Sequence, residues 1–270
     1  MIVFPNCKIN LGLHVLQKRK DGFHDLETIF YPVALHDALE IIHAPAGHTL
    51  LTTTGLELSA APVENICYKA WALLKKDFPA LPHVNIHLHK AIPSGAGLGG
   101  GSSDGAFTLL LLNQKFNLGL STHQLSTYAL ALGSDCPFFV LNKPAHALGR
   151  GEVLKAIDLD LTAFKIMIVN PKIHIQTGAA FEMVTPATGR PSLIDLIQAA
   201  PEQWPQLIKN DFETPVFSRY PEIGAIRETL YAKGAVYASM SGSGSSVYGL
   251  FPKDFVNMPS FPSHYFTAVI

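Results

Sequence analysis

The sequence predicts an α+β protein in which antiparallel strands and segregated helices form two domains. The expected strands alternate apolar and polar residues, as half-buried antiparallel strands do. The expected helices are grouped along the chain and do not follow every strand. The 270 residues, 48% of them hydrophobic, suffice to bury a sizeable core. Together these features favour α+β over a doubly wound parallel sheet.

The N-terminal part of the chain predicts a hairpin. Residues 8–16 alternate aliphatic side chains with polar or small ones, which predicts a half-buried strand. Asp21-Gly22 is a turn signal, and residues 26–33 can return as the second strand. A further short strand is expected over residues 38–42.

Helices dominate the middle of the chain, on either side of a glycine-rich loop. Apolar residues at helical spacing followed by a proline predict one helix, and Ser121 with Gln124 forms a capping box for another. In order, the expected elements are a helix over 65–78, a strand over 84–88, the loop, a helix over 103–113, the capped helix ending near Gly133, and a strand over 138–141.

The character of the sequence changes after Asp160, and we place a domain boundary near Asp158. The predicted domains are residues 1–158 and 159–270. The second domain is expected to hold a strand over 164–169, a short helix near Leu193, a helix over 221–232 with Gly234 as its C-terminal cap, and strands over 235–238, 247–251 and 265–270.

Composition argues against several classes of function. The formal net charge is −1, so no basic excess points to nucleic acid or an anionic membrane. The cysteine count is odd and no CxxC occurs, which argues against a disulfide framework and a structural zinc site. The N-terminus lacks the regions of a signal peptide, and the longest aliphatic run, Leu109 to Leu112, is too short to span a bilayer. We therefore expect a cytoplasmic protein.

The most informative segment is the glycine-rich loop that leads into the expected helix. Glycine reaches positive φ and lets a ligand approach without meeting a Cβ. The free N–H groups of a first helical turn suit a polyphosphate, and the two serines add hydroxyls for phosphate or a metal ion. The candidate nucleotide-binding residues are Pro93, Ser94, Gly95, Ala96, Gly97, Leu98, Gly99, Gly100, Gly101, Ser102 and Ser103.

Other interpretations of this loop fit less well. Gly95, Gly97 and Gly100 match a dinucleotide-binding pattern, but the preceding strand alternates and no acidic residue follows where a ribose-binding carboxylate should fall. The Walker spacing would need a lysine where Gly101 stands. A flexible linker is the remaining alternative, yet a linker does not need five glycines between a strand and an amphipathic helix.

Three segments, in order, resemble the motifs of the GHMP kinases. Residues 93–103 resemble the second motif, whose core is Pro-x-x-x-Gly-Leu-Gly-x-x-Ser, while residues 5–11 resemble the first and 239–244 the third. Asp-Gly-Phe-His at 21–24 and Gly-Ser-Asp-Cys-Pro-Phe-Phe at 133–139 resemble, more narrowly, the members that phosphorylate the 2-hydroxyl of a cytidine-diphosphate sugar alcohol for isoprenoid synthesis.

The resemblance implies a two-domain fold, with an N-terminal nucleotide-binding domain like ribosomal protein S5 domain 2 and a ferredoxin-like C-terminal domain. It also implies an ATP-dependent kinase that uses Mg²⁺ and a small-molecule substrate, with Lys8 and Asp135 as the catalytic pair. Asp135 would orient the substrate hydroxyl and accept its proton. Lys8 would keep that carboxylate ionised and offset charge on the phosphoryl group. The magnesium ligands and the oligomeric state are left open.

The same resemblance assigns a cytidine site. Phe23 and Phe181 correspond to an aromatic pair that stacks on cytosine, and His24 to the residue that reads the edge of the base. Core packing is an equal alternative for Phe181. Asn10 and Thr177 are expected to make further substrate contacts. The family more often has tyrosine at the position of Phe23. Phenylalanine lacks the phenolic hydroxyl of tyrosine but keeps the same ring face for stacking.

Asn65 and Lys90 are expected to flank the adenine of ATP by the same resemblance. The alternatives are a helix N-cap for Asn65 and a solvated charge at a strand end for Lys90. His87 and His89 form an HxH pair, for which a solvated polar face is favoured over metal binding because no third ligand is evident.

Competing functions are separated by the same residues. A non-catalytic nucleotide-binding module would be marked by loss of Lys8 or Asp135, and both are present. A homoserine or mevalonate type of GHMP kinase is disfavoured by the segment at 21–24, because those substrates carry no base to stack. A dehydrogenase is the weakest alternative.

Overall fold

The computed structural model describes residues 1–44, 47–58 and 61–270, which divide into two compact units that are each discontinuous in sequence. The first unit comprises Met1–Cys7, Ala34–Ser94 and Gly99–Lys143; the second comprises Lys8–Val33, Gly95–Leu98 and Pro144–Ile270. The strands β2 (Asn6–Lys18) and β3 (His24–His36) contribute residues to both. This grouping differs from one division at residue 158, which stays a prediction.

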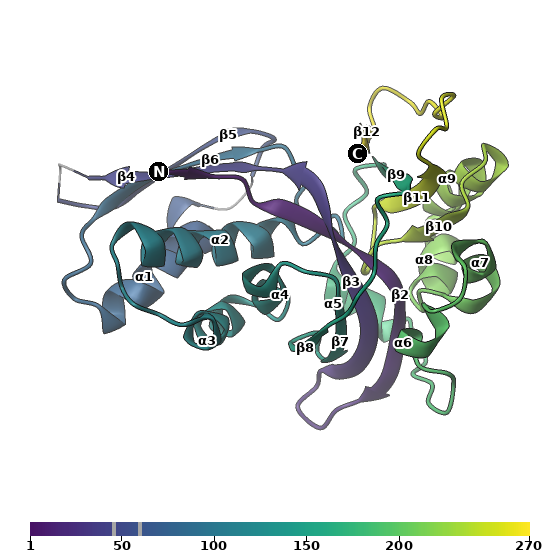
Figure 1. Ribbon diagram of the computed structural model, residues 1–270, viewed down its shortest axis with the longest axis horizontal. Coiled ribbons are helices and arrows are strands. Elements are labelled where there is room, and N and C mark those ends of the chain that lie inside the picture. Colours follow the sequence, from purple (N-terminus) through teal and green to yellow (C-terminus); the bar gives the residue numbers. More distant parts are fainter. Residues whose placement is uncertain (45–46, 59–60) are drawn as a thin grey trace. The chain divides into compact units, whose positions relative to one another are not determined.

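The first unit is a mixed sheet covered by helices. Its strands run in the order β1 (Ile2–Val3), β4 (Ala38–His43), β6 (Val84–Lys90) and β5 (Leu50–Gly55), with β4 antiparallel and β5 parallel to β6. Figure 1 shows α1 (Ile66–Asp77), α2 (Gly100–Lys115), α3 (Thr122–Leu132) and α4 (Cys136–Leu141) on one side of this sheet; a short 3₁₀ turn, η1 (Pro62–Glu64), precedes α1. The predicted strands over 38–42 and 84–88 are thereby confirmed.

The helix starts follow from the capping residues. Asn65 Oδ1 accepts a 2.9 Å hydrogen bond from the N–H of Cys67 and caps α1. Ser121 and Gln124 form the predicted capping box of α3. Gly99, with φ of 69°, is the N-cap of α2, a left-handed conformation that favours glycine.

The strand predicted after Pro137 is a helix in the structure. Residues 138–141 were expected as a strand, but they lie in the helix α4. A run of four apolar residues cannot by its period distinguish a strand from a buried helix. Pro137 decides the outcome, because proline suits a first helical turn and removes a donor that a sheet would need.

The second unit contains the predicted hairpin. β2 and β3 are neighbours in a sheet that continues through β7 (Ala145–Gly149) to β8 (Val153–Ala156). The turn between them is closed by a 2.8 Å hydrogen bond from the N–H of Arg19 to the carbonyl of Phe23. The strand β2 is buried on both faces from Asn6 to Val15, so the half-buried strand of the prediction is wrong. Its polar residues face other polar groups inside the protein.

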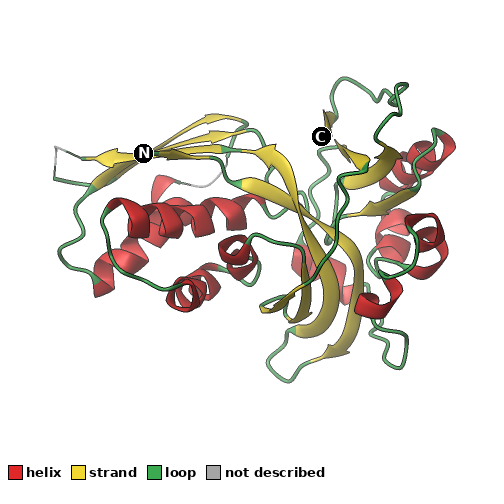
Figure 2. Ribbon diagram, viewed as in Figure 1, coloured by secondary structure: helices red, strands yellow, loops and turns green. Residues whose placement is uncertain are grey.

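Another sheet of the second unit carries a helical layer. Its order is β10 (Tyr237–Met240), β11 (Val247–Pro252), β9 (Phe164–Asn170) and β12 (Phe266–Val269), all antiparallel, which confirms the strands predicted there. α9 (Pro221–Ala232) packs on β10 and β11, and α8 (Glu213–Arg219) packs on α9 (Figure 2). The remaining short elements are α5 (Thr177–Glu182), α6 (Leu193–Leu196), η2 (Pro201–Gln203) and α7 (Trp204–Leu207).

The cysteines Cys7, Cys67 and Cys136 are free thiols, and each is buried. Burial raises the pKa of the Cys136 thiol to about 12 and that of Cys67 even further. In the ranges the structure describes, no helix has both the length and the apolar character needed to cross a membrane.

Candidate active site

Lys8 is a buried cation that reaches the glycine-rich loop. Its side chain is on β2, 3% exposed, and its ammonium donates to Asn10 Oδ1 at 2.6 Å and to the carbonyl oxygen of Gly97 at 3.1 Å. The ammonium also lies 5.0 Å from the ring centroid of Phe30, within cation–π range. The backbone N–H of Lys8 donates to the carbonyl of Leu98 at 2.9 Å. The first and second predicted motifs are therefore in direct contact through this residue.

The third predicted motif contacts the same part of the loop. Ser241 Oγ donates to the carbonyl oxygen of Gly97 at 2.8 Å. Two residues beyond the motif, the N–H of Ser246 donates to the carbonyl of Ala96 at 3.1 Å. A Cβ on Gly97 would lie 2.0 Å from the carbonyl oxygen of Ser241, and its φ is 77°. No larger residue fits at position 97 without movement of the backbone.

The start of α2 has the features expected of an anion site. The first helical hydrogen bond of its N-cap runs from the N–H of Ser103 to the carbonyl of Gly99, so the N–H groups before it have no helical acceptor. Ser103 Oγ is buried and has no hydrogen-bond partner among the described residues. A buried hydroxyl without a partner costs about 1–3 kcal/mol, which a phosphate oxygen or a bound water would offset.

Lys90 is not a solvated strand-end charge, so that alternative is wrong. Its side chain is 2% exposed, and its ammonium pairs with Asp37 and, at 2.7 Å, with Asp104 of α2. Asp37 Oδ1 also accepts the N–H groups of Ala91 and Ile92 at 2.6 and 2.9 Å. The cluster ties the end of β6 to α2 on the two sides of the glycine-rich loop.

Burial and the neighbouring charges act in opposite directions on the pKa values of this cluster. Burial raises the pKa of the Asp104 carboxyl to about 8 against the opposing charge of Lys90. Burial lowers the pKa of Lys90, but the charges of Asp104 and Asp37 outweigh it and raise the pKa overall. Lys90 therefore stays an ammonium ion. Its predicted contact with ATP stays a prediction, and the partners at positions 37 and 104 carried no signal of their own in the sequence.

Asp135 precedes the helix α4 in the first unit. It has φ of −82° and ψ of −15°, its carbonyl accepts the N–H of Phe138 at 3.2 Å, and its side chain is half-buried. Lys8 belongs to the second unit and Asp135 to the first. Their action as a pair stays a prediction.

The predicted cytidine residues lie in the second unit. Phe23 is 51% exposed, and the guanidinium carbon of Arg150 lies 4.9 Å from the centroid of its ring. The rings of His24 and Phe181 stack with centroids 4.7 Å apart and planes at 12°, and Phe181 contacts Phe212 edge-on. One face of Phe181 is thus taken by His24. A base bound on that face needs the imidazole to move, and the sandwich stays a prediction.

The two weaker substrate candidates are close to the motif residues. Asn10 accepts from Lys8 and donates through Nδ2 to Thr28 Oγ1 at 2.9 Å. Thr177, the first residue of α5, has its Oγ1 3.2 Å from Ser243 Oγ of the third motif. The substrate contacts of both residues stay predictions.

A buried carboxylate, Glu27 on β3, organises another polar cluster that the sequence did not indicate. It is joined by His146 Nε2 and the N–H of Leu193, each at 2.8 Å, and by Ser192 Oγ; His14 Nδ1 lies 3.7 Å away. Burial raises the pKa of Glu27, but the hydrogen bonds outweigh it and lower the pKa to about 2.

Comparisons with known proteins define the class of enzyme. The family model described as the GHMP kinases N terminal domain matches residues 65–143, and that described as GHMP kinases C terminal matches residues 186–256. A crystal structure of mevalonate kinase aligns over 94% of this chain and 92% of its own with a TM-score of 0.69. At 14% identity, that likeness concerns the fold alone.

Relatives with higher sequence identity show which family of GHMP kinases the chain belongs to. Proteins named 4-diphosphocytidyl-2-C-methyl-D-erythritol kinase are 51% identical in Bacteroides thetaiotaomicron, over 93% of this chain and 92% of the relative, and 50% identical in Azobacteroides pseudotrichonymphae, over 97% of both. A crystal structure of 4-(cytidine 5'-diphospho)-2C-methyl-D-erythritol kinase has a TM-score of 0.79 and 34% identity, covering 93% of this chain and 90% of that one. The chain belongs to the 4-diphosphocytidyl-2-C-methyl-D-erythritol kinase family of the GHMP kinases, and it is an ATP-dependent kinase of α+β fold.

Proposed function

We propose that the chain transfers the terminal phosphoryl group of ATP to the 2-hydroxyl of 4-diphosphocytidyl-2-C-methyl-D-erythritol, in the non-mevalonate route to isoprenoid precursors. The observation that carries this proposal is the agreement of about half of all residues with relatives of that name over nearly the whole chain. The homoserine and mevalonate kinases of similar fold share 14–15% of residues and support the class only.

The proposed chemistry depends on positioning and charge. Asp135 would orient the substrate hydroxyl and take its proton, while the Lys8 ammonium would stabilise charge on the phosphoryl group in transfer. The buried setting of Lys8 strengthens its electrostatic effect, because few waters screen it. The carbonyl of Gly97 and the amide of Asn10 fix the position of this cation.

ATP is proposed to bind along residues 93–103, with its phosphates at the first turn of α2. Mg²⁺ would arrive with ATP, held largely by phosphate oxygens and water. The hydroxyls of Ser102 and Ser103 are the protein groups that fit such a complex, since Ser103 Oγ has no partner among the residues described. Among all residues that the structure describes, no group of three or more His, Cys, Asp or Glu side chains is arranged to hold a metal ion.

The substrate base is proposed to be recognised by Phe23 and His24, with Phe181 beneath the imidazole. The exposed ring of Phe23 offers a face for stacking, and the imidazole of His24 offers ring nitrogens for the edge of a base. We place the reaction in the cytoplasm, where ATP and the substrate would both be available.

A direct assay tests the proposal. Purified protein is incubated with ATP, Mg²⁺ and, separately, the cytidine-diphosphate substrate, homoserine or mevalonate, and ADP release is measured by a coupled enzyme. We expect turnover with the cytidine substrate alone, and its loss when EDTA removes the metal. Turnover with homoserine or mevalonate, but none with the cytidine compound, would restrict the assignment to the GHMP kinase class.

A further inference from the structure

The segment of residues 209–213, which follows α7 (Trp204–Leu207), is hydrogen-bonded to the strand that carries Lys8. The N–H of Leu13 donates to the carbonyl of Lys209 at 3.0 Å, and the N–H of Asp211 donates to the carbonyl of Leu13 at 2.9 Å. Asp211 Oδ2 accepts the N–H of Val15 at 2.7 Å. Neither its composition nor its period marked this segment in the sequence.

Asn210 is hydrogen-bonded to the backbone of the third motif, residues 239–244. Its side chain is 2% exposed, and Nδ2 donates to the carbonyl oxygens of Met240 and Gly242, each at 2.8 Å. Its Oδ1 accepts the N–H of Phe212 at 3.0 Å, so both amide hydrogens and the amide oxygen are used. The two carbonyls flank Ser241, and the amide therefore fixes the backbone on either side of that residue.

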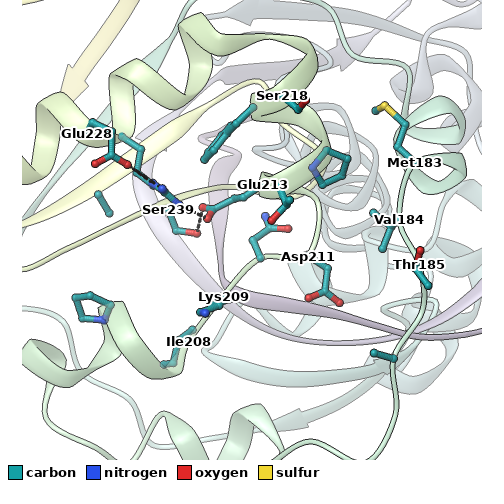
Figure 3. Close-up of a pocket in the computed structure, with 18 of the residues that line it drawn as sticks. Met183, Val184, Thr185, Ile208, Lys209, Asp211, Glu213, Ser218, Glu228 and Ser239 are labelled. Carbon is teal, nitrogen blue, oxygen red and sulfur yellow. Dashed lines mark hydrogen bonds and ion pairs between the residues drawn. The ribbon is translucent and has the colours of Figure 1, made fainter.

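Glu213 is hydrogen-bonded to β10, the strand that leads into the glycines of the third motif. Its Oε1 accepts Ser239 Oγ and the N–H of Met240, both at 2.8 Å, and its Oε2 accepts from Arg227 at 2.7 Å. Figure 3 shows Glu213 bonded to Ser239 in the wall of a pocket of about 960 Å³. The charged groups of Glu213 and Arg227 in this wall are paired with each other, which indicates a structural support.

Ser241 links the backbone held by Asn210 to residues of the first and second motifs. Its hydroxyl donates to the Gly97 carbonyl at 2.8 Å and accepts the N–H of Asn10 at 3.2 Å. The same Gly97 carbonyl accepts the Lys8 ammonium. A shift of the 240–242 backbone would therefore move an acceptor of Lys8.

We propose that Asn210 is a positioning residue for phosphoryl transfer: it fixes the 240–242 backbone, and through Ser241 it fixes the Gly97 carbonyl and the Lys8 ammonium. This inference rests on the proposed role of Lys8. It adds a residue that lies outside the three motifs and that acts through Ser241. Only an amide serves here, because a carboxylate of the same size would face two carbonyl oxygens without hydrogens to donate.

The test is a double-mutant cycle on turnover with Asn210→Ala, Ser241→Ala and the double variant. We expect Asn210→Ala to lower kcat roughly 10- to 100-fold, as a small displacement of a catalytic group does. It should add little when Ser241 is already alanine, because the effect passes through Ser241. Asn210→Asp should lose as much as Asn210→Ala, since the donors and not the packing matter.

Asp211→Ala is the matched control. It removes a neighbouring side chain with a similar number of hydrogen bonds, none of them to the third motif. It should lower Tm by a similar amount and leave kcat near the wild-type value. Additive effects in the cycle, near-native kcat in Asn210→Ala, or an equal loss of kcat in Asp211→Ala would each overturn the proposal.

The wild-type result separates this proposal from the proposed function. All ratios are taken against wild-type turnover with whichever alcohol it phosphorylates, so a wrong substrate leaves the cycle intact. If the wild type phosphorylates none, calorimetry with a non-hydrolysable ATP analogue replaces kcat. Asn210→Ala should then bind it several-fold more weakly than Asp211→Ala does, and equal affinities would overturn the proposal.

Discussion

The Lys8 ammonium lies 3.1 Å from the carbonyl oxygen of Gly97, and the hydroxyl of Ser241 donates to the same oxygen at 2.8 Å. One carbonyl thus receives hydrogen bonds from the first and third motifs while belonging to the second. This relationship explains why position 97 needs glycine. A side chain there would collide with the backbone of Ser241 and so disturb the hydrogen bonds that position the Lys8 ammonium.

Asp135→Asn tests the proposed base. The amide keeps the shape of the carboxylate and removes its basicity, so turnover should fall by about two to four decades. Affinity for ATP, measured by calorimetry with a non-hydrolysable analogue, should change little. A variant that folds, as judged by circular dichroism, and turns over near the wild-type rate contradicts the role.

Gly97→Ala and Gly101→Ala form a matched pair within the same loop. At position 97 the added methyl group would lie 2.0 Å from a backbone oxygen at positive φ, so Tm of the ligand-free protein should fall by several degrees. At position 101, in the first turn of α2, no described atom outside the neighbouring residues and the backbone of that helix lies within 4 Å of the added Cβ. Tm should hold there or rise slightly, since alanine favours helix by about 1 kcal/mol over glycine. Equal Tm changes in the two variants would contradict the prediction. They would mean that the backbone moves away from the added methyl group at position 97 without loss of stability.

Phe23→Ala tests the cytidine site. Loss of an exposed stacking ring should weaken binding of the cytidine substrate by about 1–3 kcal/mol and leave ATP almost unaffected. Phe23→Tyr should be nearly neutral because the ring face is kept. His24→Ala should let a uridine analogue compete better. The measurement is kcat/KM on the cytidine and uridine compounds, and an unchanged value in Phe23→Ala would falsify the stacking role.

Glu27 predicts how stability depends on pH. Its pKa is lowered in the folded protein from 4.5 to about 2, so its contribution is present above pH 4.5 and is lost as the pH falls toward 2. The difference corresponds to on the order of 3 kcal/mol at neutral pH. Glu27→Gln should lower Tm at pH 7 and flatten the acid side of the Tm curve. Glu202→Gln, at an exposed position, is the control and should leave the curve in place; an identical acid slope in Glu27→Gln would exclude this origin.

The fold class and the motifs could be predicted because their signals are local. Alternation indicated the β2 and β3 hairpin, and the capping box fixed the start of α3. The alternation of apolar and polar residues in β2 does not distinguish a polar face in water from one that meets other polar groups. Lys8 is buried in the structure. Similarly, the partners of Lys90 are Asp37, 53 positions away, and Asp104, beyond the glycine-rich loop, so no local pattern indicated its burial.

The site was predicted as far as its motifs extend. Asn10 and Gly97 were found through them, whereas Asn210 lies in a segment whose hydrogen bonds are visible only when β2 and the 240–242 backbone are placed beside it. The stack of His24 on Phe181 is likewise a tertiary contact between residues 157 positions apart, for which no local pattern exists.

The buried native thiols leave the surface open to site-specific chemistry. Because Cys7, Cys67 and Cys136 are enclosed and a raised pKa keeps the last two protonated, maleimide reagents should react slowly with the native fold. A cysteine introduced at Val256, which is 81% exposed, should then take a fluorophore selectively without prior replacement of any natural cysteine. The dye at this position would label the protein at one known site on its surface.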